Sequence, residues 1–376
     1  DFKQFEPHLN RIVDLTKAIA ECFSPYEHVY DPFLDQYEPG ITTKEVKQIF
    51  ETIRPQQVAL IKAISERPQV DDTFLHQHFP FDKQWEMVMF VAEKFGLSWD
   101  RSRQDRSAHP FTTSFGQNDV RITTKIQENL PMSGLFSTMH ETGHALYELG
   151  FDPKHRRTPL SSSASAAFHE SQSRMWENII GRSRDFWRYF YPIFQNQFHS
   201  QLDGVSLDSF YKAINKVEPS LIRTEADEAT YNLHVMLRFE IEMGLLDGSV
   251  EVKSLPELWN TLMKEYLGVT PDSDKNGVLQ DIHWSWGMIG YFPTYALGNI
   301  ISVQLWEKII SDIPKIHDRI ITGEFSEVRE WLRENVQKFG AKYYPQDLIE
   351  RITGSSINPK PYINYLSNKY SEIYDL

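Results

Sequence analysis

The segment His140-Glu141-Thr142-Gly143-His144 carries side chains that bind a metal ion and move a proton. Residues four apart on a helix share a face, so His140 and His144 can direct imidazole nitrogens at one ion. Glu141 then lies beside that ion, where it can act on bound water. With 13 histidines in 376 residues a chance match is rare. The motif therefore predicts a hydrolytic metal site.

A third ligand is needed, because a catalytic zinc site has three protein ligands and one open position for water. Glu170 is the preferred candidate, in a later segment whose apolar positions continue as a helix through Ile180. His169 is the alternative ligand. Adjacent residues on a helix point about 100° apart, so we do not expect His169 and Glu170 to bind the same ion.

Six short motifs extend this pattern along essentially the whole chain. They are His109-Pro110-Phe111, Asp119-Val120-Arg121-Ile122-Thr123, the His140 to His144 segment, His169-Glu170-Ser171-Gln172, Ile222-Arg223-Thr224-Glu225-Ala226-Asp227, and Gly277-Val278-Leu279-Gln280-Asp281-Ile282-His283-Trp284. In this order they resemble the metallocarboxypeptidases of the carboxypeptidase Taq type, also called thermostable carboxypeptidases. Members of that family are longer at the amino end, so the resemblance implies that this chain lacks an N-terminal segment of helices.

The resemblance implies a mainly α, funnel-shaped metallopeptidase fold with a deep cleft, the metal at its bottom, and a small β-hairpin or sheet beside it. It implies Zn²⁺, with Co²⁺ as an alternative ion, and a homodimer. The implied reaction removes single residues from the carboxyl ends of peptides with broad side-chain preference, proline being disfavoured. Residues 1–376 would then form one two-lobed catalytic domain.

Two arginines are candidates for binding the terminal carboxylate of a peptide, which an exopeptidase acting at that end must recognise. Arg223 precedes a helix expected to start near Thr224 and has acidic neighbours, so a local ion pair is the alternative. Arg121 lies on an expected strand, where an exposed position on the polar face is the alternative. The resemblance favours substrate binding for both arginines.

A tetrahedral intermediate also needs a hydrogen-bond donor for its oxyanion. His283, Tyr291 and Tyr295 form a cluster of suitable donors and are the further catalytic candidates, although aromatic-rich segments more often belong to a core. His109 precedes a proline, which disfavours the middle of a helix. It is a candidate for substrate binding, with a backbone-satisfying role beside the hairpin as the alternative.

Helices are the elements that must position most of these residues. The metal motif falls in a helix expected from Ser133, as N-cap, to Gly150. Helical spacing of apolar residues recurs elsewhere, for example over residues 46–53. One hairpin is expected, with strands at 111–115 and 120–126 that turn the Arg121 side chain away from the apolar face.

Composition restricts the partners. The chain has 39 Lys and Arg against 52 Asp and Glu, a net charge of −13, without any basic run, so nucleic acid is not expected. Cys22 is the only cysteine, which excludes an intramolecular disulfide and favours a reducing, cytoplasmic location. No window approaches about 18 consecutive apolar residues, so no membrane partner is expected.

We interpret the sequence as a zinc-dependent metallocarboxypeptidase acting on peptides with a free C-terminal carboxylate, with Glu141 as general base for metal-activated water. The alternative is an endopeptidase or oligopeptidase on the same helical scaffold, which would need no dedicated carboxylate clamp. A catalytically silent protein with a structural metal is less favoured, because a structural site has closed coordination and needs no base such as Glu141.

Overall fold

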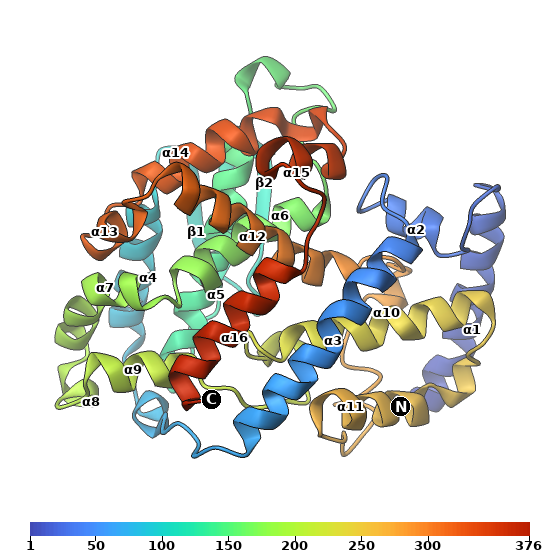
Figure 1. Cartoon of the computed structure of the whole chain (residues 1–376), viewed down its shortest axis with the longest axis horizontal. Coiled ribbons are helices and arrows are strands. Elements are labelled where there is room, and N and C mark those ends of the chain that lie inside the picture. Colours follow the sequence, from blue (N-terminus) through green and yellow to red (C-terminus); the bar gives the residue numbers. More distant parts are fainter. The chain divides into compact units, whose positions relative to one another are not determined.

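The computed structural model describes all of residues 1–376, which form mainly helices and one three-stranded sheet (Figure 1). The mainly α fold expected from the helical periodicity is confirmed. The chain sorts into two compact units, one of Asp1–Pro68, Val217–Leu297 and Asn358–Leu376, the other of Gln69–Lys216 and Gly298–Ile357. That they act as one catalytic domain stays a prediction. No helix combines the length and the apolarity needed to cross a bilayer.

The first unit is built around α10 (Tyr231–Asp247), a helix buried on nearly all sides. Helices α1, α3 and α11 pack against it, and α16 packs against α3. The elements of this unit are α1 (Phe2–Glu21), α2 (Asp31–Asp35), α3 (Thr43–Ser65), η4 (Arg223–Glu225), η5 (Val252–Ser254), α11 (Leu255–Leu267), η6 (Trp284–Trp286) and α16 (Lys360–Tyr374). Since α10 also carries Arg238 and Glu242, this core contains charged groups that need partners.

Glu242 finds its partners in three separate segments. Its carboxylate accepts hydrogen bonds from the hydroxyl of Tyr30 at 2.7 Å, the indole N–H of Trp284 at 2.8 Å and the backbone N–H of Gly290 at 3.1 Å. Burial raises the pKa of Glu242 to about 7 in spite of these donors. Glu242 therefore joins α10 to the segments before α2 and before α12 (Pro293–Asp312).

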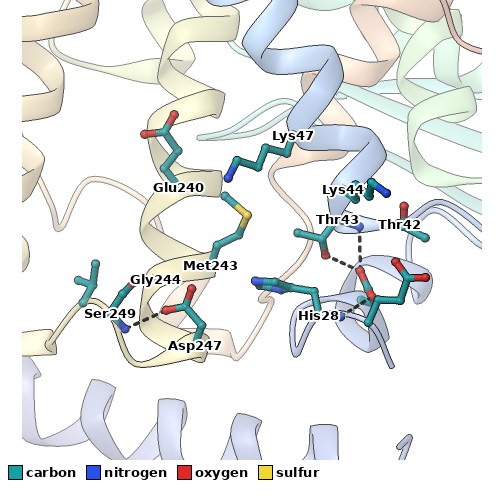
Figure 2. Close-up of a pocket in the computed structure, with 13 residues that line it drawn as sticks. His28, Thr42, Thr43, Lys44, Lys47, Glu240, Met243, Gly244, Asp247 and Ser249 are labelled. Carbon is teal, nitrogen blue, oxygen red and sulfur yellow. Dashed lines mark hydrogen bonds between the residues drawn. The ribbon is translucent and has the colours of Figure 1, made fainter. Parts of the chain in front are cut away.

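A cavity of about 420 Å³ also belongs to the first unit (Figure 2). Its lining mixes acidic and basic side chains from the start of α3, the end of α10 and the segment before α2: Glu27, His28, Asp31, Thr42, Thr43, Lys44, Lys47, Glu240, Met243, Gly244, Asp247, Ser249 and Val250. None of the candidate residues from the sequence lies in this cavity, so the chemistry they predict belongs elsewhere.

The second unit is built around α5 (Pro131–Gly150), which packs against α4, α6, η3, η7 and two strands. The elements are η1 (Thr73–His76), α4 (Phe81–Phe95), β1 (Ser102–Arg106), β2 (Thr112–Gly116), β3 (Asp119–Thr124), η2 (Pro153–His155), α6 (Ala166–Arg174), η3 (Met175–Ile180), α7 (Arg184–Gln197), α8 (His199–Leu202), α9 (Leu207–Ile214), most of α12, α13 (Ile316–Ile321), α14 (Ser326–Asn335), η7 (Gln337–Lys342) and α15 (Pro345–Thr353). The expected N-cap at Ser133 is wrong, because α5 begins at Pro131, whose missing N–H needs no partner there.

The sheet has the order β1-β3-β2, with β3 antiparallel to β2 and parallel to β1. The expected hairpin is confirmed, with its strands shifted by one residue at their starts and the second ending at Thr124. Val120 and Ile122 point into the core while Arg121 is exposed, as the alternation predicts. Strand β1, with the polar sequence Ser-Arg-Gln-Asp-Arg, was not expected, because only its pairing with β3 makes it a strand.

Candidate metal centre

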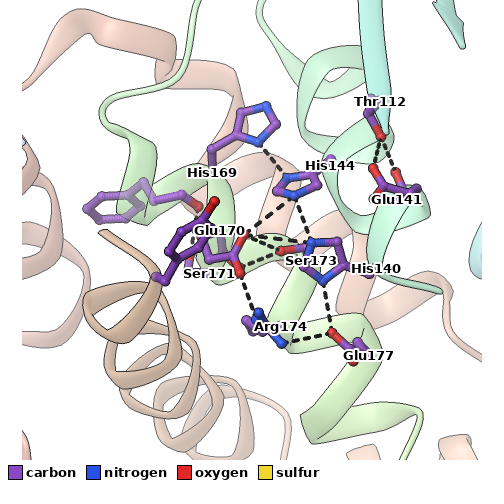
Figure 3. Close-up of polar contacts among 12 residues, drawn as sticks. Thr112, His140, Glu141, His144, His169, Glu170, Ser171, Ser173, Arg174 and Glu177 are labelled. Carbon is purple, nitrogen blue, oxygen red and sulfur yellow. Dashed lines mark hydrogen bonds and ion pairs between the residues drawn. The ribbon is translucent and has the colours of Figure 1, made fainter. Parts of the chain in front are cut away.

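His140 and His144 lie on the same face of α5, one turn apart, and point their Nε2 atoms at one place (Figure 3). These two nitrogens are 3.1 Å apart. Burial, then the neighbouring His169 and His140, holds the pKa of His144 well below its usual value. Burial lowers the pKa of His140 too, but Glu170 and Glu177 outweigh it and leave that pKa raised.

Glu170 on α6 completes the group. Its Oε2 lies 3.7 Å from His140 Nε2 and 3.5 Å from His144 Nε2. Helix α6 begins with the hydroxyl of Ser165 accepting the N–H of Phe168, a normal N-cap. These three side chains form the one group in the chain whose ligand atoms converge as a metal site requires.

The triangle of ligand atoms fits a small divalent ion. Bonds of about 2.0–2.1 Å in tetrahedral geometry place neighbouring ligand atoms about 3.4 Å apart. The three separations here are 3.1, 3.5 and 3.7 Å, close to that value. Two imidazoles and one carboxylate are also the donor set of catalytic zinc sites, which leave a fourth position open.

The close contact of α5 and α6 depends on Gly143. A Cβ atom at this position would lie 2.5 Å from the carbonyl oxygen of Gln172 and 2.6 Å from the Cα of Ser173. Both atoms belong to the backbone of α6, so only glycine allows the two helices to approach this closely. On the other side, Gly298 of α12 faces the Glu170 side chain, where a Cβ would come within 2.6 Å.

Arg174 determines which oxygen of Glu170 faces the histidines. Its Nε donates to Glu170 Oε1 at 2.7 Å, and the hydroxyl of Ser173 lies 3.2 Å from Oε2. With Oε1 occupied by the guanidinium, Oε2 is directed toward His140 and His144 (Figure 3). The group is therefore arranged for binding through one carboxylate oxygen.

Each histidine also has a partner at its outer nitrogen. His140 Nδ1 contacts Glu177 Oε2 at 2.8 Å, and Glu177 lies in η3, a π-helical turn that continues α6. Burial alone would raise the pKa of Glu177, but Arg174 and His140 lower it to about 2, so the group is an anion. His144 Nδ1 instead contacts the imidazole of His169, at 2.5 Å.

Glu141 is buried beside His140, His144 and Glu170, and a residue of the sheet binds its carboxylate. The hydroxyl of Thr112, on strand β2, lies 2.6 Å from Glu141 Oε2. Burial raises the pKa of Glu141, while His140 and the Thr112 hydrogen bond lower it, with burial the larger effect. A smaller lowering of the same pKa comes from His109, whose Nδ1 lies 2.7 Å from the carbonyl oxygen of Pro110.

Arg121 belongs to this unit but has a local partner. Its guanidinium makes two hydrogen bonds, of 2.8 and 2.9 Å, to the carboxylate of Asp119, and it lies over the ring of Phe115. The side chain is 45 % exposed. Its contacts are those of the alternative considered from the sequence, a residue on the polar face of the strand, and its substrate role stays a prediction.

Arg223, in the first unit, is buried and anchored. Its Nη2 donates to Asp281 at 2.7 Å and its Nη1 to the hydroxyl of Tyr231 at 2.9 Å. Arg238 donates to the other oxygen of Asp281, also at 2.7 Å. The helix expected to start near Thr224 is wrong, because Arg223 begins a single 3₁₀ turn and the long helix starts only at Tyr231. In the segment between them, Asp227 Oδ1 accepts the backbone N–H of Thr230.

His283, Tyr291 and Tyr295 cluster in the first unit, as the sequence suggested. His283 Nε2 lies 3.2 Å from the hydroxyl of Tyr295, and the rings of the two tyrosines are 5.2 Å apart. Burial and then the charge of Arg223 lower the pKa of His283 to about 4, so its imidazole is neutral. The catalytic role of these three residues stays a prediction.

Sequence reasoning did not identify four residues near the site. They are Arg174, Glu177 and Thr112, whose contacts are described above, and Glu148, whose Oε1 lies 2.8 Å from His169 Nε2. Glu177 lies two turns after Glu170 and Glu148 one turn after His144, so helical spacing offered a signal for both. Thr112 offered no such signal, because its contact with Glu141 joins a strand to a helix.

Comparisons with known proteins find relatives that match nearly the whole chain. The family model of the carboxypeptidase Taq (M32) metallopeptidases matches residues 1–370. Carboxypeptidase 1 of Bacillus subtilis is 40 % identical over 375 residues, covering 100 % of this chain and 75 % of that protein. Thermostable carboxypeptidase 1 of Thermus thermophilus is 40 % identical over 386 residues, with 100 % and 75 % covered. The crystal structure of an M32 carboxypeptidase from Deinococcus radiodurans R1 matches with a TM-score of 0.98 at 40 % identity, covering 100 % of this chain and 76 % of that one.

Proposed function

The chain belongs to the carboxypeptidase Taq (M32) family of metallopeptidases, and from this premise we propose that it is a zinc-dependent enzyme removing single residues from peptide carboxyl ends. As a member of that family it is a metallocarboxypeptidase, a peptide hydrolase. The observation that carries the proposal is the triangle of His140, His144 and Glu170, with Glu141 buried beside it. A broad side-chain preference, a homodimeric state and a cytoplasmic location belong to the same proposal.

His140, His144 and Glu170 would hold the ion, with Co²⁺ as an alternative to Zn²⁺. When bound, such an ion polarises the scissile carbonyl and makes water nucleophilic near neutral pH. Glu141 takes the proton of the attacking water and delivers it to the nitrogen of the leaving amine, while the C–O bond forms and the C–N bond breaks. Thr112 holds Glu141 Oε2, which leaves Oε1 for the proton.

Arg223, helped by Arg121, would bind the terminal carboxylate. Asp281 and Tyr231 use three of the N–H groups of Arg223, so the guanidinium still has donors for a second carboxylate. Asp281 also holds the fork in one orientation, which favours a two-point interaction. His109 would contact substrate near Glu141.

His283, Tyr291 and Tyr295 would donate hydrogen bonds to the developing oxyanion. A neutral imidazole has one N–H that can donate such a hydrogen bond. The pKa of about 4 leaves His283 neutral near neutral pH. The tyrosine hydroxyls are donors of the same kind.

Metal analysis tests the assignment of the ligands and the base. Glu141→Gln should keep one divalent ion per chain while losing about 10²- to 10⁴-fold in turnover, the usual contribution of a general base. Glu170→Ala should instead weaken binding of the ion itself. If Glu141→Gln were empty and Glu170→Ala fully loaded in elemental analysis, the two roles would have to be exchanged or dropped.

Amidated peptides test the carboxylate clamp. The intact enzyme should cleave a free-acid peptide far better than its amide, and Arg223→Ala should lose about 30- to several-thousand-fold in kcat/KM on the acid and little on the amide. Arg223→Lys should recover only part, because an ammonium lacks the planar fork. If the intact enzyme cleaved the free-acid and amide peptides at equal rates, or cut them at internal bonds, the endopeptidase alternative would be favoured. If it cleaved neither peptide, the catalytically silent metal protein would be favoured.

A further inference from the structure

The outer nitrogen of His144, Nδ1, contacts a second histidine, His169, rather than a carboxylate. We propose that His169 and Glu148 are positioning residues that hold His144 in the orientation and tautomer required for metal binding. The inference rests on the proposed metal site, because it concerns one of its three ligands. It also gives His169 a role other than that of the alternative ligand considered from the sequence.

The contacts form a continuous line. His144 Nδ1 lies 2.5 Å from His169 Nδ1, and His169 Nε2 lies 2.8 Å from Glu148 Oε1. The two imidazoles are stacked, with ring centroids 4.5 Å apart (Figure 3). The ring of Tyr147 lies 5.4 Å from that of His169. Both nitrogens of His169 are therefore occupied, and neither is available to an ion at the triad.

The positions of the protons along this line follow from the chemistry of the two ends. His144 points Nε2 at His140 and Glu170, so its proton must sit on Nδ1 when Nε2 binds an ion. This N–H donates to His169 Nδ1, which must then be unprotonated. The proton of His169 consequently sits on Nε2 and donates to Glu148, which as a carboxylate only accepts.

His140 offers an internal comparison. Its Nδ1 donates directly to a carboxylate, that of Glu177, which is itself held by Arg174 at 3.2 Å. His144 reaches its carboxylate, Glu148, only through the imidazole of His169. A hydrogen bond from the outer nitrogen fixes the ring and makes the inner nitrogen a better ligand. Both histidines thus receive this support, by different means.

The arrangement of the helices makes the line possible. Glu148 lies one turn after His144 on α5, while His169 comes from α6 beside Glu170. Consecutive residues of α6 therefore serve the site in two ways, with Glu170 facing the ion and His169 facing the back of His144. The side chains of His169 and Glu148 are 25 % and 20 % exposed, so substitutions there do not disturb a sealed core.

Two substitutions at His169 separate hydrogen bonding from packing. His169→Phe keeps a ring to stack on His144 but has no acceptor, whereas His169→Asn loses the ring and keeps an acceptor near the position of Nδ1. At the far end, Glu148→Gln keeps an acceptor for His169 and Glu148→Leu does not. His317→Phe is the matched control, because His317 pairs with Asp185 at 2.8 Å in the same unit, without contact to the triad.

The measurement is the Kd for Zn²⁺ of the chelator-stripped proteins, by competition with a chromophoric chelator, together with the visible absorption of the Co²⁺-loaded proteins. We expect His169→Phe to bind Zn²⁺ about 10- to 100-fold more weakly, with a changed Co²⁺ spectrum. His169→Asn should be affected less than His169→Phe, and Glu148→Gln less than Glu148→Leu. The control should match the intact protein, and circular dichroism should show all variants folded.

Other results would overturn the inference. If His169→Phe bound Zn²⁺ as tightly as the intact protein, or more tightly than His169→Asn, the imidazole would act by packing alone. If His169→Asn lost the ion completely while Glu170→Gln kept it, His169 would be the ligand. If the intact protein bound no ion, or His140→Ala bound it unchanged, the proposed metal site itself would fail. The first two results leave metal-dependent function standing, whereas the last does not.

Discussion

Gly143→Ala tests whether the close contact between α5 and α6 places Glu170 at the metal site. The added Cβ would lie 2.5 Å from the carbonyl oxygen of Gln172, where ordinary contact begins at 3.4 Å. The second close atom, Ser173 Cα, is also backbone, so no side-chain rotation relieves the overlap. The two helices must therefore move apart by about 0.9 Å.

The expected loss of stability is small, while the loss of metal affinity is larger. Overpacking costs about 1–3 kcal/mol, and replacing a helical glycine by alanine returns about 1 kcal/mol. The free energy of unfolding should therefore fall by about 0–2 kcal/mol. Metal sites tolerate ligand displacements of only about 0.2 Å, so a shift of Glu170 several times larger should weaken Zn²⁺ binding at least about 10-fold.

Gly134→Ala is the matched control on the same helix. Its Cβ would meet the Cγ1 of Ile126 at 3.3 Å and the carbonyl oxygen of Lys125 at 3.4 Å, distances that small adjustments accommodate. Its free energy of unfolding should be unchanged or up to about 1 kcal/mol higher, with unchanged Zn²⁺ affinity. Urea unfolding of the metal-free proteins and chelator competition measure the two quantities. If Gly143→Ala bound Zn²⁺ as tightly as Gly134→Ala, the helix contact would not determine the position of Glu170.

Three further predictions concern single contacts. Thr112→Val removes the hydroxyl that holds Glu141, so kcat should fall about 10- to 100-fold with Zn²⁺ affinity unchanged, and Thr112→Ser should restore it; a valine variant with full kcat would refute this role. Folding raises the pKa of Glu242 from 4.5 to about 7, chiefly by burial. The stabilisation from protonated Glu242 is fully present below about pH 4.5 and is lost as the pH rises through about 7. Between these pH values the free energy of unfolding of the intact protein should therefore fall by about 3 kcal/mol more than that of Glu242→Gln. If the free energies of unfolding of the two proteins changed in parallel with pH, this prediction would be contradicted. Lys369→Met leaves Glu228 buried without its partner at 2.6 Å and should lower the free energy of unfolding by about 3–5 kcal/mol, a loss below about 1 kcal/mol counting against the pair.

The residues that sequence identified best are those whose geometry is local. His140 and His144 share a face because the α-helix repeats every 3.6 residues, whatever surrounds the helix. The alternation around Arg121 likewise predicted that Val120 and Ile122 are buried and Arg121 exposed, because a strand repeats every two residues. It was wrong for Thr123, which is buried on the face expected to be polar. In both cases the spacing of the residues along the chain is enough to tell which side chains lie on the same face of the element.

Residues whose positions depend on a second element were harder to predict. Strand β1 has no apolar alternation and exists through its pairing with β3. The turn at Arg223 is not the start of a helix, because Asp227 engages the backbone N–H of Thr230 before α10 begins. Local propensity carries no information about such long-range or competing hydrogen bonds.

The sequence by itself determined that two imidazoles and a carboxylate could act on one ion, and the helical segment after the motif made Glu170 the preferred third ligand, with His169 as the alternative. The tertiary structure decided how these groups are held. The sequence shows that residue 143 is a glycine. Only the structure shows that this glycine lets the backbone of α6 approach the backbone of α5. Glu177, His169 and Thr112 act on the site through nitrogens and oxygens brought in from other elements. Such partners are selected by packing, since a hydrogen bond of 2.5–3 Å is decided by how helices and strands are placed, not by their order in the chain.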